Sequence, residues 1–154
     1  MNYWLFKSEP DVFSIDDLAA CRNKTTYWDG VRNYQARNYL RDTIKKGDGV
    51  LFYHSNSEPL AIVGTCEVVK EGYPDFTAFE PESKYFDPGS SPDKTVWYMV
   101  DIRLKEKLKQ PVTLAMLKAK PELKNMKLLQ KGNRLSVMPV TPDEWKTILE
   151  MQNL

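Results

Sequence analysis

Residues 28–40 read WDGVRNYQARNYL, and within them a β-favouring segment gives way to an amphipathic helix. The Asp29-Gly30 pair ends the β-favouring segment, because Asp and Gly favour turns over strands. An apolar stripe at helical spacing follows, formed by Ala36, Leu40 and Ile44. We therefore predict a short strand over residues 25–28 and a helix over residues 33–45, with Asn33 as the helix N-cap.

The segments on either side of this block predict further strands and short helices. Strands are expected where β-branched and aromatic residues run or alternate, at residues 3–6, 50–55, 60–69 and 96–104, with one or two more within residues 128–137. Helices are expected after Ser14, over residues 114–118, and from Thr141, where Thr, Pro and Glu form a capping motif. Together these elements predict a single α+β domain over residues 1–154, with a curled, barrel-like mixed sheet and short helices packed around it.

Charge is distributed unevenly along a chain whose formal net charge is only +1. Residues 22–46 carry seven basic and two acidic side chains, and residues 103–134 carry ten basic and two acidic ones. Residues 71–94 carry six acidic and two basic side chains, mostly within a long predicted loop. This asymmetry permits a positive face that would attract nucleic acid. The alternative is that the lysines of residues 105–124 only solvate helices and loops.

Composition argues against secretion, metal binding and membrane insertion. Cys21 and Cys66 lie far apart with no CxxC or histidine-rich partner, so neither a disulfide framework nor a zinc site is expected. No apolar run approaches the roughly 20 residues that a membrane helix needs. The first ten residues lack the basic start and the cleavage site of a signal peptide. We therefore expect a cytoplasmic monomer without a metal or another cofactor.

Motifs for common catalytic systems are missing from the sequence. His54 is the single histidine, and no G-x-S-x-G elbow, phosphate-binding glycine loop or His-x-x-x-His pair occurs. A hydrolase that uses the carboxylates of Glu9 and Asp29, with His54, stays open as an alternative. The pattern favours a binding protein over an enzyme.

Polar and aromatic residues gather where the predicted elements end, in residues 7–10, 28–33, 53–56 and 134–137. Aromatic rings stack on bases, contributing about 1–3 kcal/mol per base. Amide and carboxylate groups such as those of Asn33 and Glu9 can bond to base edges. Structural explanations compete with these roles. A tryptophan such as Trp28 is more often a core residue than a stacking surface. Asn33 can simply cap its helix, and Glu9 can close a turn. His54 can be a buried histidine whose hydrogen bonds are satisfied within the protein.

These segments resemble the EVE domain family. The resemblance rests on residues 4–10 (WLFKSEP), 28–40, 52–55 (FYHS) and 134–140 (RLSVMPV), and it extends in order along essentially the whole chain. It implies a PUA-like fold and kinship with YTH domains, which bind N6-methyladenosine in RNA through an aromatic cage. It also implies recognition of modified cytosine, such as 5-methylcytosine, in DNA, or of modified bases in RNA.

The resemblance implies a non-catalytic domain that captures one modified base of a nucleic acid in a polar-aromatic pocket. By position, Trp28 corresponds to the tryptophan that opens the pocket, and Asn33 to a polar group just before the helix. The expected base pocket comprises Lys7, Ser8, Glu9, Trp28, Val31, Asn33, Tyr53, His54, Ser55 and Ser136. The expected phosphate contacts are Arg32, Arg37, Arg41 and Arg134. Two alternatives stay open: an enzyme that acts on a modified base, and a protein-interaction adaptor that uses the acidic residues 71–94.

Overall fold

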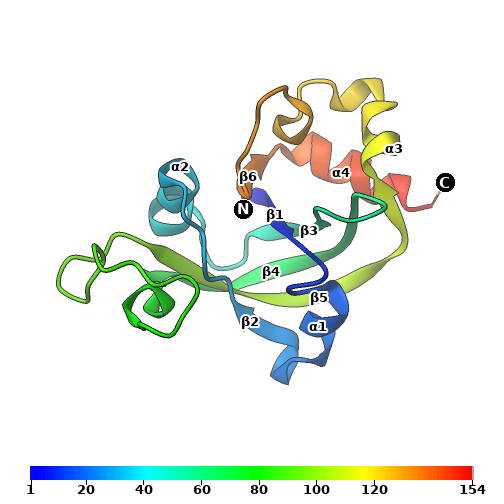
Figure 1. Cartoon of the computed structure of the whole chain (residues 1–154). Coiled ribbons are helices and arrows are strands. Elements are labelled where there is room, and N and C mark those ends of the chain that lie inside the picture. Colours follow the sequence, from blue (N-terminus) through cyan, green and yellow to red (C-terminus); the bar gives the residue numbers. More distant parts are fainter. Residues whose placement is uncertain (154) are drawn as a thin grey trace.

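The computed structural model describes residues 1–153 and is built on a mixed sheet of six strands with short helices around it (Figure 1). The strands lie in the order β2-β5-β4-β3-β1-β6. Their bounds are β1 (Tyr3–Ser8), β2 (Thr25–Tyr27), β3 (Gly49–His54), β4 (Ala61–Pro74), β5 (Tyr98–Thr113) and β6 (Val137–Val140). This architecture confirms the predicted α+β class and is consistent with a PUA-like fold.

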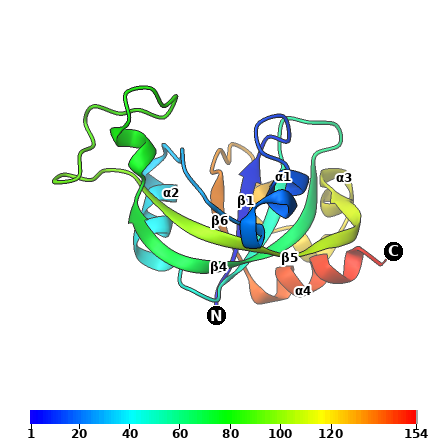
Figure 2. The same cartoon turned by 90° about the horizontal axis from the view of Figure 1, so that it is seen from below.

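The sheet is not closed, so the predicted barrel is wrong. Closing a barrel requires the two edge strands to pair with each other. Within residues 1–153, β2 pairs only with β5, and β6 pairs only with β1. Both edges are short, with three residues in β2 and four in β6. The sheet is nevertheless strongly curved, and Figure 2 shows β4 and β5 running side by side as a bent ribbon.

Strands β4 and β5 continue well beyond the predicted residues 60–69 and 96–104. Their pairing contains several register shifts, which let the long ribbon bend without breaking. Gly64 lies at one shift, where a Cβ atom would stand 2.7 Å from Cδ1 of Ile15 and 3.0 Å from the carbonyl oxygen of Glu106. A side chain at this position would push the two strands or helix α1 (Ile15–Ala20) apart.

The helices begin where the capping residues predict. Ser14 and Thr141 form capping boxes at the starts of α1 and α4 (Pro142–Met151), and α3 (Leu114–Lys118) begins after Thr113. Asn33 caps α2 (Tyr34–Asn38), but the predicted continuous helix changes into a π-helical turn, η2 (Tyr39–Thr43). The N–H of Ile44 donates to the carbonyl of Tyr39 across five residues, at 2.9 Å, which closes this wider turn.

The strands expected within residues 128–137 are absent up to Val137. A 3-10 turn, η5 (Lys127–Leu129), and a loop precede β6. Side-chain amides satisfy backbone groups here, since Gln130 donates to the carbonyls of Lys124 and Met126 and Asn133 donates to that of Lys127. This local bonding replaces the ladder that a strand would need.

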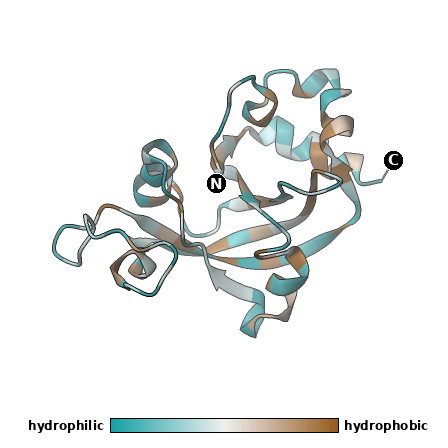
Figure 3. Ribbon diagram, in the orientation of Figure 1, coloured by the Kyte–Doolittle hydropathy of each residue, from teal (hydrophilic) through white to brown (hydrophobic). Residues whose placement is uncertain are grey.

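Alternating residues bury two hydrophobic clusters, one on each face of the sheet. In β1, Trp4 and Phe6 enter one cluster and Leu5 enters the other. Figure 3 shows the same alternation of hydrophobic and hydrophilic residues along β4 and β5. Trp28 belongs to the first cluster, at a point where the chain leaves β2 and turns toward α2. The candidate site lies at this rim of the core.

Candidate functional site

A cavity of about 550 Å³ lies beside the carboxyl end of β1, next to the turn that follows β2. Because β1 and β3 are parallel and in register to Ser8 and His54, both strands end at the same edge of the sheet. The N–H of Ser55 donates to the carbonyl of Ser8 at 2.9 Å and holds the two ends together. The cavity is lined by Lys7, Ser8, Glu9, Val12, Phe13, Thr26, Tyr27, Trp28, Asp29, Gly30, Val31, Ser55, Lys84, Tyr85, Arg134 and Ser136.

Trp28 is a core residue and a wall of the cavity at once. Its side chain is only 8% exposed, and its ring packs at 5.3 Å from Phe6 and 5.5 Å from Phe52, measured between centroids. The indole N–H groups of Trp4 and Trp97 donate to aspartates, whereas that of Trp28 donates to no atom of residues 1–153. No side-chain nitrogen or oxygen sealed from solvent in this part of the chain lacks a partner, so the N–H of Trp28 remains accessible.

Two groups of opposite charge are half-buried in the cavity. Burial lowers the pKa of the Lys7 ammonium, which has no ion-pair partner within residues 1–153. Burial raises the pKa of Asp29, and the nearby Asp75 carboxylate raises it further. Both shifts disfavour the charged form of the side chain. A ligand that donates to the Asp29 carboxylate, or accepts from the Lys7 ammonium, would stabilise that charged form.

Gly30 and Tyr85 form a second wall. Gly30 has a φ of +80°, and a Cβ atom there would stand 2.5 Å from Cζ of Tyr85. The backbone and the tyrosine ring therefore touch at a distance that only glycine permits. Lys84 lies beside the same ring, with its ammonium 5.0 Å from the ring centroid.

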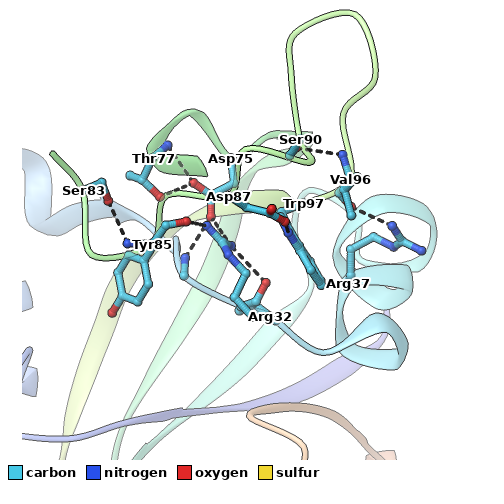
Figure 4. A network of polar contacts seen from close by, with 12 residues as sticks. Arg32, Arg37, Asp75, Thr77, Ser83, Tyr85, Asp87, Ser90, Val96 and Trp97 are labelled. Atoms are coloured by element: carbon cyan, nitrogen blue, oxygen red, sulfur yellow. Dashed lines mark hydrogen bonds and ion pairs between the residues drawn. The ribbon is translucent and has the colours of Figure 1, made fainter. Parts of the chain in front are cut away.

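Hydrogen bonds from Arg32 hold this second wall against the rest of the site, as Figure 4 shows. Its Nη1 donates to Oδ2 of Asp75 at 2.9 Å, and its Nη2 donates to the carbonyl of Tyr85 at 2.7 Å. The Asp75 carboxylate has no exposed surface, and it also accepts from the N–H of Gly30 at 2.9 Å and from Thr77. The guanidinium lies between the rings of Tyr85 and Trp97, at 5.6 and 5.3 Å from their centroids. We call residues 71–94 the acidic segment. Its Lys84 and Tyr85 form a wall of the cavity, and the Arg32–Asp75 ion pair holds this wall in place.

Most residues of the expected base pocket come together here. Those that line the cavity are Lys7, Ser8, Glu9, Trp28, Val31, Ser55 and Ser136. Three do not, and their placement is a correction. The side-chain oxygen Oδ1 of Asn33 caps α2 by accepting from the N–H of Ala36. Tyr53 is 3% exposed and belongs to the cluster on the opposite face of the sheet. Nε2 of His54 accepts from the N–H of Ile15 at 3.1 Å, at the start of α1.

Three of the four expected phosphate-binding arginines are already engaged within the chain. Arg32 bonds to Asp75, Nη1 of Arg37 donates to the carbonyl of Val96 at 2.6 Å, and Arg41 pairs with Asp42 at 2.8 Å. Of the four, only Arg134 lines the cavity. Arg37 of α2 and Arg41 of η2 therefore hold a neighbouring loop and a carboxylate within the protein.

Several lining residues carry no signal of this role in the sequence. Lys84 and Tyr85 belong to the acidic segment, where no periodicity or motif distinguishes them from their neighbours. Val12 and Phe13 lie in the turn after β1. Asp29 was expected only as a residue of the alternative hydrolase. Its position directly after Trp28 and before a positive-φ glycine is the signal that could have placed it in the pocket.

Within residues 1–153, no group of three or more His, Cys, Asp or Glu side chains is arranged to hold a metal ion. In the same range, every helix is too short or too polar to cross a membrane.

The chain is similar to known proteins along nearly its whole length. The EVE domain family matches residues 2–151. Human thymocyte nuclear protein 1 is 42% identical over 98% of this chain and 74% of its own length. A structure of human THYN1 protein in complex with DNA containing 5-methylcytosine superposes with a TM-score of 0.94, at 42% identity, and covers 100% of this chain and 99% of that chain. A hypothetical protein from Leishmania major is 48% identical, with a TM-score of 0.93 over 99% of this chain and 95% of its own.

The same relatives correct one expectation. We expected a cytoplasmic location, but the human, mouse and rat relatives carry the name of a nuclear protein. The cytoplasmic prediction is therefore contradicted.

Proposed function

The chain belongs to the EVE domain family, and on this premise we propose that it binds DNA containing a modified cytosine, takes that base into the cavity beside Trp28, and releases it unchanged. One observation carries the proposal. The cavity joins an aromatic wall to the Trp28 N–H and the Lys7 ammonium, for which residues 1–153 supply no hydrogen-bond acceptor and no ion-pair partner respectively, in a fold shared with a human protein crystallised with 5-methylcytosine DNA.

The size and lining of the cavity suit one flat heterocycle. Sites for small ligands usually enclose about 300–1,000 Å³ and combine apolar walls with a few polar groups. Here Trp28, Phe13 and Tyr85 supply aromatic surface. A base must leave the duplex to reach such a site, and contact with an aromatic surface offsets part of its lost stacking.

The polar groups match the edge of cytosine. Cytosine offers an amino group as donor and a ring nitrogen and a carbonyl as acceptors. The Asp29 carboxylate can accept from the amino group, while the Lys7 ammonium and the Trp28 N–H can donate to the two acceptors. A 5-methyl group would add one buried carbon, worth about 0.8 kcal/mol, so binding should favour 5-methylcytosine by roughly fourfold.

The position of His54 supports binding without catalysis. The single imidazole accepts from the N–H of Ile15 at the start of α1 and does not line the cavity, so it cannot assist the carboxylates of Glu9 and Asp29 that do line it. We therefore propose that the captured base returns to the strand intact. Mass spectrometry of the oligonucleotide after prolonged incubation tests this point, and any modified or abasic product would contradict it.

Titration of matched labelled oligonucleotides tests the binding role. Each would contain one cytosine, 5-methylcytosine or 5-hydroxymethylcytosine at the same position, in DNA duplexes and in the corresponding RNA. We expect the modified DNA to bind several-fold more tightly than the unmodified DNA. Trp28→Phe should reduce that affinity, because phenylalanine keeps an aromatic wall but removes the N–H donor.

Trp145→Phe is the matched control, because Trp145 stacks on Tyr3 at the other end of β1, with ring centroids 4.5 Å apart. Equal affinity of the wild-type protein for modified and unmodified cytosine would refute the proposal. Equal losses in the two tryptophan variants would remove Trp28 from the site.

A further inference from the structure

A surface loop next to the cavity concentrates positive charge without any acidic residue. We call residues 124–134 the basic loop; its cations are Lys124, Lys127, Lys131 and Arg134. All four side chains are exposed, and within residues 1–153 none of them forms an ion pair. They differ in this respect from the arginines of α2 and its surroundings, whose guanidinium groups have partners.

Side-chain hydrogen bonds fix the backbone of the basic loop, although its cations have no ion-pair partner within residues 1–153. The Gln130 amide donates to the carbonyls of Lys124 and Met126, both at 3.1 Å, and the Asn133 amide donates to that of Lys127 at 2.6 Å. The side-chain oxygen of Asn133 accepts from the N–H of Leu135 at 2.9 Å. Met126 is 1% exposed and anchors the loop in the hydrophobic core. Such a loop presents its charges without first having to become ordered.

The basic loop runs directly into the wall of the cavity. Arg134 and Ser136 both line the cavity, and the carbonyl of Ser136 accepts from the N–H of Lys7 at 2.8 Å. Lys131 is therefore three residues from the cavity, on the segment between η5 and β6 that is orange in Figure 1. A strand whose base occupies the cavity would have its neighbouring phosphates beside this loop.

We propose that the basic loop binds the phosphate backbone of the strand whose base enters the cavity. The inference rests on the proposed function and assigns the phosphate contacts to Lys124, Lys127, Lys131 and Arg134. Arg32, Arg37 and Arg41, which have partners within the chain, do not take part. One strand of a duplex carries a phosphate about every 3.4 Å of helix axis, so four exposed cations on one loop can contact more than one of them. These contacts position the nucleic acid and do not distinguish one base from another.

The double variant Lys127→Gln with Lys131→Gln tests the proposal. Both side chains are exposed and lie outside the cavity, so the fold and the pocket should stay intact, which a melting curve checks. The dissociation constant for a 5-methylcytosine duplex would be measured over a series of salt concentrations. Loss of two phosphate contacts should reduce the slope of log affinity against log salt by about 1.8. The affinity ratio between modified and unmodified cytosine should not change.

The matched control is Lys46→Gln with Lys94→Gln, which removes two exposed lysines that lie outside both the cavity and the basic loop. Lys46 lies just before β3, and Lys94 lies in the segment between β4 and β5. An unchanged slope in the loop variant, or an equal change in the control, would overturn the proposal. Absence of any preference for modified cytosine in the wild-type protein would instead contradict the proposed function, and the salt slopes would still identify the phosphate-binding surface.

Discussion

Asp29 shows at the scale of one residue how the cavity affects stability. Its folded pKa lies above the ordinary value of 3.8, because of burial and then the Asp75 carboxylate. Between the unfolded and folded pKa values the folded state binds more protons, so stability falls as pH rises through this window and stays lowered at neutral pH. Asp29→Asn should therefore raise the free energy of unfolding at pH 7, with a gain that shrinks as pH approaches 4. Urea unfolding at several pH values measures it.

Asp93→Asn is the control for the loss of one negative charge, since Asp93 is exposed in the acidic segment and does not line the cavity. The same gain from both substitutions would show that the effect comes from overall charge and not from the buried site. If Asp29 accepts from cytosine, the stabilised variant should also bind modified DNA more weakly, which is the stability–function conflict expected of a binding residue.

Gly30 tests the contact that forms the second wall. Alanine there must adopt a positive φ, which costs roughly 1–2 kcal/mol, and it must also displace the Tyr85 ring. Gly47 has a φ of +93° with nothing within 4 Å of a Cβ atom, so Gly47→Ala carries the conformational cost alone. We expect Gly30→Ala to destabilise more than Gly47→Ala and to weaken base binding, with the difference reduced when Tyr85→Ala is added. Thermal unfolding and titration would report equal effects if Tyr85 were not a fixed wall.

Single residues show how far sequence could predict the site. Trp28 was expected at a pocket from the resemblance to EVE domains and in the core from its residue type, and the structure shows both a core contact and a cavity wall. Asn33 was predicted both as the helix N-cap and as a base contact, because an amide before a helix suits either role, and the structure shows the cap. The role of Arg32 depends on Asp75, which lies 43 residues away, and no local pattern identifies such a partner.

At the scale of elements, the Arg32–Asp75 ion pair holds the segment between β4 and β5 against the pocket. Arg32→Ala would leave the fully buried Asp75 carboxylate without its cation, which costs about 3 kcal/mol for a buried pair. Arg41→Ala breaks the exposed pair with Asp42 and should cost less than about 1 kcal/mol. Urea unfolding gives the free energies, and hydrogen exchange should accelerate in residues 76–97 for Arg32→Ala alone. Unchanged exchange there would mean that other contacts hold the segment.

Elements with strong local signals were predicted well. Capping residues and apolar spacing identified α1, the start of α2, α3 and α4, and β-favouring runs identified β1, β2 and β3. The full lengths of β4 and β5 were not predicted, because the additional residues, 70–74 and 105–113, are rich in polar side chains. Each of these parts is stabilised by pairing with the predicted part of the other strand. The barrel was wrong for a related reason: closure depends on whether two distant edge strands meet, and neither strand's own sequence specifies that.

At the scale of the whole molecule, the cavity sits where the sheet, the acidic segment and the basic loop converge. Trp28 lies in the cluster that contains Phe6 and Phe52, so the wall of the site belongs to the cooperative core. The chain is nearly neutral overall, and its acidic and basic side chains are concentrated in different segments. This arrangement should steer nucleic acid toward the basic loop while the Arg32–Asp75 pair neutralises part of the acidic segment beside the cavity.

Because the site is built into the core, its ligand should stabilise the entire domain. A modified oligonucleotide at 100 times its dissociation constant adds about 2.7 kcal/mol to the free energy of unfolding, which corresponds to a rise of about 5–10 °C in Tm for a chain of this size. Unmodified DNA of fourfold weaker affinity, at the same concentration, should give a rise smaller by about 2–3 °C. Differential scanning calorimetry with the two oligonucleotides measures the difference, and Trp28→Phe should diminish it while Trp145→Phe leaves it intact. Equal shifts with both oligonucleotides would mean that the protein binds only the phosphate backbone and that the modified base does not occupy the cavity.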